Sequence, residues 1–419
     1  MFLGVHDETA RRPMTTPLSP RRELWLLLTL AGIQFTHILD FMIMMPLGPQ
    51  FTRLFGISNA RFGLLVSAYT LAAGLSGLLA ATYLDRFDRK TLLLLLYGLF
   101  GLATLACALA GSYDTLLAAR VLAGTFGGVL AALSQTIVAD VIPFGRRGRA
   151  MGIVMTSFSV STVAGVPLGL LLAAHFSWHA AFFGIAALVA VLVLGAWVTL
   201  PPLRSHLQAS GQRHGLHAVL QVLADAPHRQ ALLFSALLMF AGFTVIPFIT
   251  LYLQSNVGWP AERVPVVYLC GGVATLLSAR LIGSLSDRLG KVRVFRWLAL
   301  LVTLPLLGIT LTAGLPVWAV LTVSTLFFVS MSGRMIPGMA LITACAKPQQ
   351  RGSFMALNSA TQSAGMGLAA FVGGQIISRD AQQLVQHYWL AALVGAACSL
   401  GTWWLAARLT MHESATHPG

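Results

Sequence analysis

The chain has 419 residues, of which 57% are hydrophobic and only 10% are charged. A soluble protein of this length would need far more polar surface, so the composition excludes a soluble globular protein. Apolar runs of 18 residues or more recur from one end to the other, and one membrane-spanning helix needs roughly 20 residues. The sequence therefore predicts an all-α membrane protein with twelve transmembrane helices.

The net charge of +14 would suggest a nucleic-acid partner in a soluble protein. The distribution of the basic residues along this chain indicates that the positive charge reflects membrane topology instead. Twenty of the 27 lysine and arginine residues fall in segments that are cytoplasmic if the N-terminus is inside, and four fall in the opposite loops. This asymmetry predicts a multi-pass protein with both termini in the cytoplasm, and no nucleic-acid partner.

Six apolar runs follow a polar N-terminal tail, residues 1–22. Pro46 and Pro49 break the first run near its outer end, because proline removes a helical N–H group. The six predicted spans are at about 24–47, 61–83, 90–110, 115–138, 150–174 and 179–200. Together they form an N-terminal half, residues 23–200, and no cleaved signal peptide is expected.

Pro201-Pro202 opens a long polar segment that is rich in His, Gln, Gly and Arg. We expect this segment, residues 201–229, to be a cytoplasmic linker between two halves. Six further spans are predicted at about 230–254, 264–285, 294–313, 316–342, 353–377 and 387–408. They form a C-terminal half, residues 230–408, which a cytoplasmic tail, residues 409–419, follows.

Landmarks of the first half recur in the second at nearly constant spacing. Pro46 matches Pro247 at 201 residues, Asp85 matches Asp287 and Arg61 matches Arg263 at 202, and Arg147-Gly148 matches Arg351-Gly352 at 204. Unrelated hydrophobic segments would not repeat such landmarks at one spacing. The repeat indicates two pseudo-symmetric six-helix halves.

The loop Gly283-Ser-Leu-Ser-Asp287-Arg288-Leu-Gly290-Lys291 resembles the signature loop of the major facilitator superfamily. Its first-half copy, Ala81-Thr-Tyr-Leu-Asp85-Arg86-Phe-Asp88-Arg89-Lys90, departs from the signature where Ala81 and Asp88 replace glycines. The resemblance implies a gating latch between the halves, formed by Gly283, Asp287, Arg288, Gly290, Asp85, Arg86, Asp88 and Arg89. The alternative is a topology signal alone. Gly290 permits a turn with positive φ, and Asp88 can adopt that conformation too, at some cost.

Two helix motifs resemble those of exporters in this superfamily. Leu117-Ala-Ala-Arg120-Val-Leu-Ala-Gly124 is similar to the fourth-helix motif of proton antiporters. Gly165-Val-Pro167-Leu-Gly169 is similar to a degraded copy of their fifth-helix motif. The resemblance is to the twelve-span drug:proton antiporters and the arabinose-efflux-permease-like group.

This resemblance implies a monomeric transporter of the bacterial cytoplasmic (inner) membrane and not an enzyme. It would move protons and a small-molecule substrate across the lipid bilayer, driven by the proton gradient, with no cofactor and no metal. A phosphate-binding glycine loop is absent from the sequence, since Gly290-Lys291 is followed by valine, and ATP drive is not expected.

Asp40 is the only carboxylate deep inside a predicted span. Burying a carboxylate costs on the order of 3 kcal/mol even on lenient insertion scales, so the position indicates function. Burial disfavours the charged form, which suits a proton carrier. His37 and Gln34 lie one and two turns earlier on the same face. Two interpretations remain open: proton carriage or substrate contact, and polar packing against a neighbouring helix.

Arg120 and Arg334 are the other charges inside spans, and each should face a partner within the protein. Arg120 could bias proton release from Asp40 or pair structurally with Asp114. Arg334 lies near Pro337, which suggests the cavity wall, where it could bind an anionic group or only backbone carbonyls.

Further side chains are candidates for the substrate cavity, with core packing or helix-to-helix polar contact as the alternative. Phe41, Met44, Phe243 and Phe248 could form an adaptable apolar lining, and Asn358 and Gln362 could supply polar contacts. The sequence thus predicts a proton-coupled exporter of small amphipathic molecules that works by alternating access. The alternative is a transporter of a metabolite such as a sugar, an amino acid or a siderophore.

Overall fold

The computed structural model describes residues 19–83, 87–142, 146–200, 203, 215–347 and 350–412. Asp85 and Arg86 of the first signature loop lie outside the described residues, as do residues 1–18 and 413–419. Helices account for most of the described part of the chain.

The helices divide between the two halves of the sequence. The first half contains α1 (Pro20–Ile43), α2 (Gly48–Leu54), α3 (Asn59–Tyr83), α4 (Arg89–Ala108), α5 (Tyr113–Val141), α6 (Arg147–Val160), the π-helical turn η3 (Ser161–Gly165), α7 (Val166–His175) and α8 (Trp178–Thr199). The second half contains α10 (Ala226–Phe243), η5 (Ile246–Phe248), α11 (Ile249–Ser255), η6 (Ala261–Arg263), α12 (Val264–Leu289), α13 (Lys291–Leu301), α14 (Thr303–Gly308), η7 (Ile309–Leu311), α15 (Val317–Gly333), α16 (Met335–Cys345), α17 (Arg351–Ile376) and α18 (Tyr388–Ala406).

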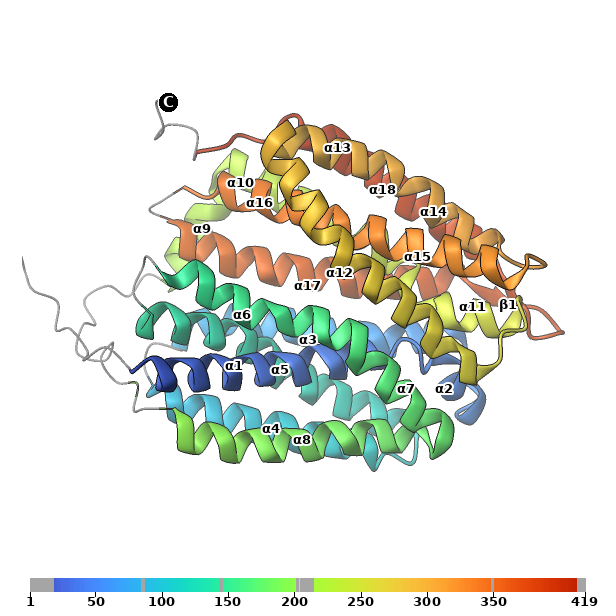
Figure 1. The fold of residues 1–419 in the computed structure, drawn as a ribbon, viewed down its shortest axis with the longest axis horizontal. Helices are drawn as coiled ribbons and strands as arrows, with labels where there is room; N and C mark the ends of the chain where they lie inside the picture. Colours follow the sequence, from blue (N-terminus) through green and yellow to red (C-terminus); the bar gives the residue numbers. More distant parts are fainter. Residues whose placement is uncertain are drawn as a thin grey trace, which may run out of the picture.

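Two smaller features join these helices. Helix α9 (Gly215–Ala224) precedes α10, and a two-stranded hairpin of β1 (Ser378–Arg379) and β2 (Val385–Gln386) connects α17 to α18. Helix α9 and the end of α18 lie at one end of the bundle, and α2, α11 and the hairpin lie at the other (Figure 1). We call these the linker end and the α2 end.

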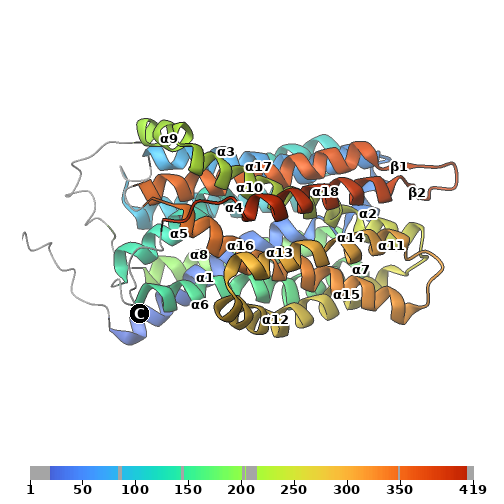
Figure 2. The same ribbon diagram turned by 90° about the horizontal axis from the view of Figure 1, so that it is seen from above.

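The helices form two bundles side by side, α1 to α8 in one and α10 to α18 in the other (Figures 1 and 2). Within the described residues, eleven helical stretches are long and apolar enough to cross a membrane. The remaining predicted span is α17, which has 26 residues and is rich in glycine, serine and amide side chains. Its polar composition fits its position, because α17 contacts both α3 and α10 rather than lipid alone. The predicted fold of twelve spans in two halves is confirmed.

The seam between the halves is built where α3 meets α17. A Cβ added at Gly63 would lie 2.6 Å from the carbonyl oxygen of Ala370, and one added at Gly74 would lie 2.9 Å from Cβ of Ser363. The Ser67 hydroxyl donates across the seam to the carbonyl of Gly367 at 2.7 Å. Small residues therefore let two backbones approach closely, as membrane helices do when lipid provides no hydrophobic drive for association.

Prolines interrupt equivalent helices of the two halves. Helix α1 ends at Ile43 and α2 begins only at Gly48, while α10 ends at Phe243 and passes into the short turn η5. Pro46 and Pro247 lie in these two breaks. A third break, η3, precedes Pro167, whose ring crowds the preceding helical turn. Pro46 and Pro247 are both buried, so the first two breaks lie within the protein, where irregular backbone is tolerated.

Side-chain hydrogen bonds between the halves are concentrated at the α2 end, among the residues that the structure describes. Arg379 donates through Nε to Oδ1 of Asn59 at 3.2 Å and through Nη2 to the hydroxyl of Thr52 at 2.8 Å. The amide of Asn59 donates to the carbonyl of Ile377 at 3.3 Å. The rings of Phe62 and Phe248 meet edge to face beneath them at 5.9 Å. The β1–β2 hairpin therefore ties the second half to α2 and α3 of the first.

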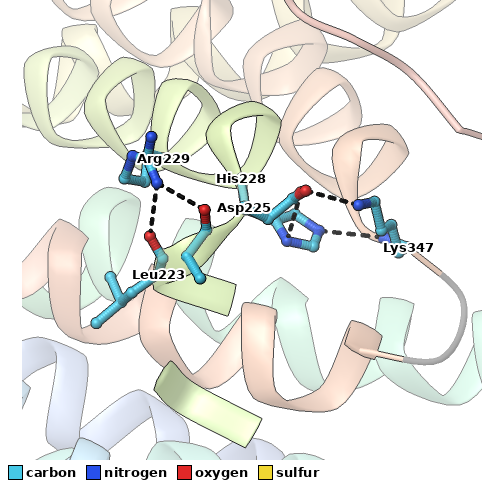
Figure 3. A network of polar contacts seen from close by, with 6 residues as sticks. Leu223, Asp225, His228, Arg229 and Lys347 are labelled. Carbon is cyan, nitrogen blue, oxygen red and sulfur yellow. Dashed lines mark hydrogen bonds and ion pairs between the residues drawn. The ribbon is translucent and has the colours of Figure 1, made fainter. Parts of the chain in front are cut away.

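At the linker end, one carboxylate joins α10 to the turn before α17 (Figure 3). Asp225 accepts from Nζ of Lys347 at 2.7 Å and lies 3.1 Å from Nδ1 of the buried His228. The hydrogen bond from Lys347 lowers the pKa of the Asp225 carboxyl below its ordinary value. Arg229 donates to the carbonyls of Leu223 and Ala224 at the end of α9, which satisfies acceptors that the helix leaves unpaired.

At the linker end, some helix limits and backbone angles differ from those predicted from the sequence. Helix α9 lies within the predicted linker, and α10 begins at Ala226 rather than at 230. Asp88 does not use the positive φ that is open to it: its φ is −58°, and its side chain accepts from the Lys90 N–H at 2.9 Å as the N-cap of α4. An aspartate cap satisfies a free helical donor, so no left-handed residue is needed there. Gly290 has a φ of +88° between α12 and α13, as expected.

Candidate functional site

Asp40 and Arg120 form an ion pair in the interior of the first half. Nη1 of Arg120 lies 2.7 Å from Oδ2 of Asp40, and both side chains are fully buried. The hydroxyl of Thr104 donates to the other carboxylate oxygen at 3.3 Å. The pair thus joins three helices, because Asp40 lies on α1, Thr104 on α4 and Arg120 on α5.

Of the two partners weighed for Arg120, the structure selects Asp40 and not Asp114. A mid-span cation and anion on adjacent helices neutralise each other, which reduces the cost of burying either charge. Losing one member would leave the other charged and uncompensated, at a cost of about 3–5 kcal/mol.

Aromatic rings surround this pair. The guanidinium carbon of Arg120 lies 4.3 Å from the ring centroid of Tyr69 on α3, within cation–π range. The ring of His37 lies 6.0 Å from that of Tyr69, and neither ring nitrogen of His37 has a hydrogen-bond partner among the described residues. Gly127 makes room for both, since a Cβ there would lie 2.6 Å from His37 and 2.8 Å from the Tyr69 hydroxyl. We call these residues, with Asp40, Arg120 and Thr104, the Asp40 cluster.

A line of rings leads from the Asp40 cluster to the second half. Phe41 stacks on Tyr69 with ring centroids 5.5 Å apart, and on Phe243 with ring centroids 5.9 Å apart. Phe243 is the last residue of α10, next to the break that contains Pro247. Packed side chains therefore connect the Asp40 cluster to the helix break of the second half that contains Pro247.

Arg334 occupies a separate site, in the core of the second half. Its guanidinium donates through Nη1 to the hydroxyl of Ser399 at 3.2 Å and through Nη2 to the carbonyl of Leu238 at 3.0 Å, and only 1% of the residue is exposed. The Ser399 hydroxyl in turn donates to the carbonyl of Ala299 at 2.8 Å. These contacts tie together α10, α13, α18 and the junction of α15 with α16. They match the backbone-carbonyl alternative, whereas the anion-binding alternative has no contact here to support it.

The other predicted cavity residues are dispersed. Met44 and Phe248 are fully buried in the core near the α2 end, whereas Phe41 and Phe243 are only partly buried. Gln34 and Asn358 are almost fully buried, and the carbonyl oxygen of each side-chain amide has no hydrogen-bond donor among the described residues. Gln362 contacts the sulfur of Met339 at 3.2 Å. Of the predicted set, the structure brings together His37, Asp40, Phe41, Arg120 and Phe243.

The predicted antiporter motif packs against α1. A Cβ added at Gly165 would lie 3.0 Å from Leu39, and one added at Gly169 would lie 2.7 Å from Ile43. Leu39 and Ile43 flank Asp40 in sequence on α1, so this motif, which includes Pro167 in the first turn of α7, supports the helix that carries the buried carboxylate. In the second signature loop, Gly283 has open space around it, and Asp287 and Arg288 occupy the last turn of α12. In the first, the backbone N–H of the buried Arg89 donates to the carbonyl of Leu203 at 3.4 Å.

Sequence reasoning missed Tyr69, Thr104 and Gly127. Each lies inside a long apolar run, where tyrosine, threonine and glycine are ordinary residues. One signal was available for Tyr69, since a phenol in the middle of a predicted span needs a polar neighbour. Nothing in the sequence places that neighbour on α5, because the pairing of α3 with α5 is a tertiary property.

Comparison with known proteins agrees with the fold. The family model of the Major Facilitator Superfamily matches residues 30–336 and, in a second match, residues 231–418. The uncharacterized MFS-type transporter YtbD of Bacillus subtilis strain 168 is 27% identical over 346 residues, covering 82% of this chain and 85% of YtbD. The uncharacterized MFS-type transporter YbcL of the same organism is 24% identical over 374 residues, covering 88% and 92% of the two chains.

Solved structures of transporters share the fold at low sequence identity. The nucleoside transporter NupG matches with a TM-score of 0.75 at 15% identity, covering 93% of this chain and 99% of its own. A bacterial homologue of the human lysosomal transporter Spinster, in an inward-facing and occupied conformation, matches with a TM-score of 0.72 at 17% identity, with coverage of 94% and 98%. The xylose transporter XylE of E. coli, in a partially occluded inward-open conformation, also has a TM-score of 0.72, at 15% identity, with coverage of 94% and 99%. The chain belongs to the major facilitator superfamily, and it is a multi-pass membrane transporter rather than an enzyme.

Proposed function

We propose that this transporter exports small amphipathic molecules in exchange for protons, by alternating access. The observation that carries the proposal is the fully buried ion pair of Asp40 with Arg120. A carboxylate whose partner is a fixed cation has two stable arrangements: charged and paired, or protonated and released. Proton coupling needs such a two-state element.

The cycle follows from the contacts of the pair. Protonation of Asp40 cancels its attraction for Arg120 and loosens the link between α1 and α5. The guanidinium then keeps the Tyr69 ring as its neighbour, and Tyr69 contacts Phe41, which contacts Phe243 of the second half. Loss of the proton toward the cytoplasm restores the pair. The repacking of these rings is the step that would couple protonation to the rocking of the two halves.

One proton in each cycle is energetically sufficient. Moving one elementary charge through 100 mV releases about 2.3 kcal/mol, which drives a neutral substrate uphill roughly 50-fold. The Asp40 cluster contains a single carboxylate, so a stoichiometry of one proton fits its composition.

In this proposal the linker end faces the cytoplasm of a bacterial cell and both termini are cytoplasmic, because the basic residues are concentrated on that side. Arg379, Asn59 and Thr52 then join the halves on the outer side. Such contacts support a conformation closed toward the outside, from which a substrate would enter from the cytoplasm. The protein would work as a monomer, with one substrate path between its halves.

A metabolite transporter is the second candidate. Two observations favour it: Gln34 and Asn358 hold buried amide oxygens without a donor among the described residues, and the structural neighbours include transporters of xylose and nucleosides. A hydroxyl-rich substrate could donate hydrogen bonds to such oxygens.

Transport by everted membrane vesicles tests the proposal. When an amphipathic compound is added to energised vesicles, exchange for lumenal protons makes the lumen more alkaline. Asp40→Asn should abolish this response. The matched control, Asp114→Asn, changes an acid in the first turn of α5 and should leave the response unchanged. An unaltered response in Asp40→Asn would refute the proton role, and sugar or nucleoside uptake that makes the external medium more alkaline would favour the second candidate.

A further inference from the structure

A basic groove lies at the linker end, on the side of the second half away from the Asp40 cluster. It has a volume of about 840 Å³ and lies between the end of α12, the start of α13 and the end of α18. Its charged lining comes from Asp287, Lys291, Arg293 and Arg296, and its aromatic lining from Trp297 and Trp403. Asp287 belongs to the second signature loop, and none of these residues takes part in the proton-coupling steps proposed above.

The turn at Gly290 sets the position of the cations. Its φ of +88° ends α12 and starts α13 directly at Lys291, so Lys291 and Arg293 lie in the first turn of the new helix, where free backbone N–H groups also favour anions. The guanidinium of Arg296 lies 4.1 Å from the ring centroid of Trp403, and its Nε has no acceptor among the described residues. With Asp287 as the one carboxylate in the lining, the groove carries a net positive charge.

An apolar stripe continues from the groove along α13 and into α14. Trp297 is 52% exposed, Leu300 is 42% exposed and Leu304 is 70% exposed. Their spacing of three and four residues puts them on one helical face. In a membrane protein an exposed face of this kind contacts lipid chains, and a tryptophan at its start is typical of the membrane–water interface. The groove therefore presents cations at headgroup depth and leucines below them.

We propose that this groove binds the headgroup of an anionic phospholipid, with an acyl chain lying along Trp297, Leu300 and Leu304. Basic pockets between transmembrane helices recognise anionic headgroups through this combination of charge and depth. The proposal requires only that the chain lies in a bilayer. It is independent of the transported substrate and of proton coupling, so its failure would leave the transport proposal untouched.

Native mass spectrometry of the purified full-length protein tests the site, with phosphatidylglycerol and phosphatidylcholine of identical acyl chains as the two probes. The expected preference of the unaltered protein for phosphatidylglycerol is about 30-fold, because two net charges contribute roughly 1 kcal/mol each near the membrane surface. Lys291→Gln/Arg293→Gln should bring the preference close to parity. Both side chains are exposed, so the double variant should fold normally. Lys291→Glu/Arg293→Glu should invert the preference.

The control removes the same charge from the same end of the molecule. Arg21 and Arg22 are exposed at the start of α1, outside the groove, and Arg21→Gln/Arg22→Gln should retain the preference. Equal loss in both double variants would mean a diffuse charge effect and would overturn the site. Displacement of phosphatidylglycerol by millimolar inorganic phosphate would identify a soluble-anion site and would overturn the lipid assignment, whereas an unchanged lipid signal supports it.

Discussion

The Asp40–Arg120 pair gives the sharpest stability prediction. The charged atoms lie 2.7 Å apart and are fully buried, so their attraction at an effective dielectric constant of 20 is about 6 kcal/mol. The cost of removing both charged groups from water offsets most of this attraction when Asp40 and Arg120 are both present. When one is removed, the other stays buried without a partner, and Asp40→Leu or Arg120→Met alone should cost about 3–5 kcal/mol.

The double variant distinguishes a pair from two independent residues. Asp40→Leu/Arg120→Met removes both charges and leaves none uncompensated, so it should recover most of the loss caused by either single change. The measurement is unfolding of the reconstituted protein by a denaturing detergent, followed by intrinsic fluorescence for all four proteins. A coupling energy below about 0.5 kcal/mol, which is the ordinary error of additivity, would refute the assignment. So would a double variant as unstable as the sum of the singles.

Three further predictions test other parts of the structure. Gly127→Ala should destabilise the protein by about 1–3 kcal/mol, because its Cβ would lie 2.6 Å from His37; thermal unfolding measures this, and Gly98→Ala, which has open space around it, is the neutral control. Arg379→Gln should weaken the contact between the halves at the α2 end by about 1.5–3 kcal/mol. The distribution of distances between spin labels at Leu54 and Leu384 should then broaden toward longer values. An unchanged distribution would contradict the role of Arg379 in closure. Because its hydrogen bond from Lys347 lowers the pKa of Asp225, this carboxylate stabilises the fold above its unfolded-state pKa and loses that contribution as the pH falls through its folded-state pKa. Asp225→Asn should therefore flatten the acid limb of the unfolding profile, and an identical acid limb in both proteins would contradict this.

The fold was predictable from the sequence because membrane insertion imposes length and charge rules on each helix separately. Predicted and observed helix limits differ by a few residues at most positions, and Pro46 and Pro247 marked the equivalent breaks in the two halves. Several elements escaped prediction, including α2 and the β1–β2 hairpin between α17 and α18. Helix α9 lies in a polar segment whose contacts with α17 are tertiary, and the π-helical turn η3 depends on how Pro167 is accommodated.

The site was predictable only in part, because the sequence identifies charged residues that are costly to bury in a membrane but does not identify their partners. Asp40 and Arg120 stand out as mid-span charges, yet they are separated by 80 residues, and no local rule pairs them. Arg334 stands out equally, but its partners are the hydroxyl of Ser399 and the carbonyl of Leu238. Such neutral acceptors leave no trace in a sequence, which is why both interpretations of Arg334 remained open before the contacts were known.

The two halves repeat each other in backbone but not in charge. Ala241 lies 201 residues after Asp40, the same interval that separates Pro46 from Pro247, so the second half has no carboxylate at the equivalent position. Its interior cation, Arg334, is instead held by neutral groups that cannot take up a proton at physiological pH. A fixed charge of this kind cannot alternate between two protonation states. If the transporter is proton-coupled, the switching element therefore belongs to the first half, and the second half responds through the contact between Phe41 and Phe243.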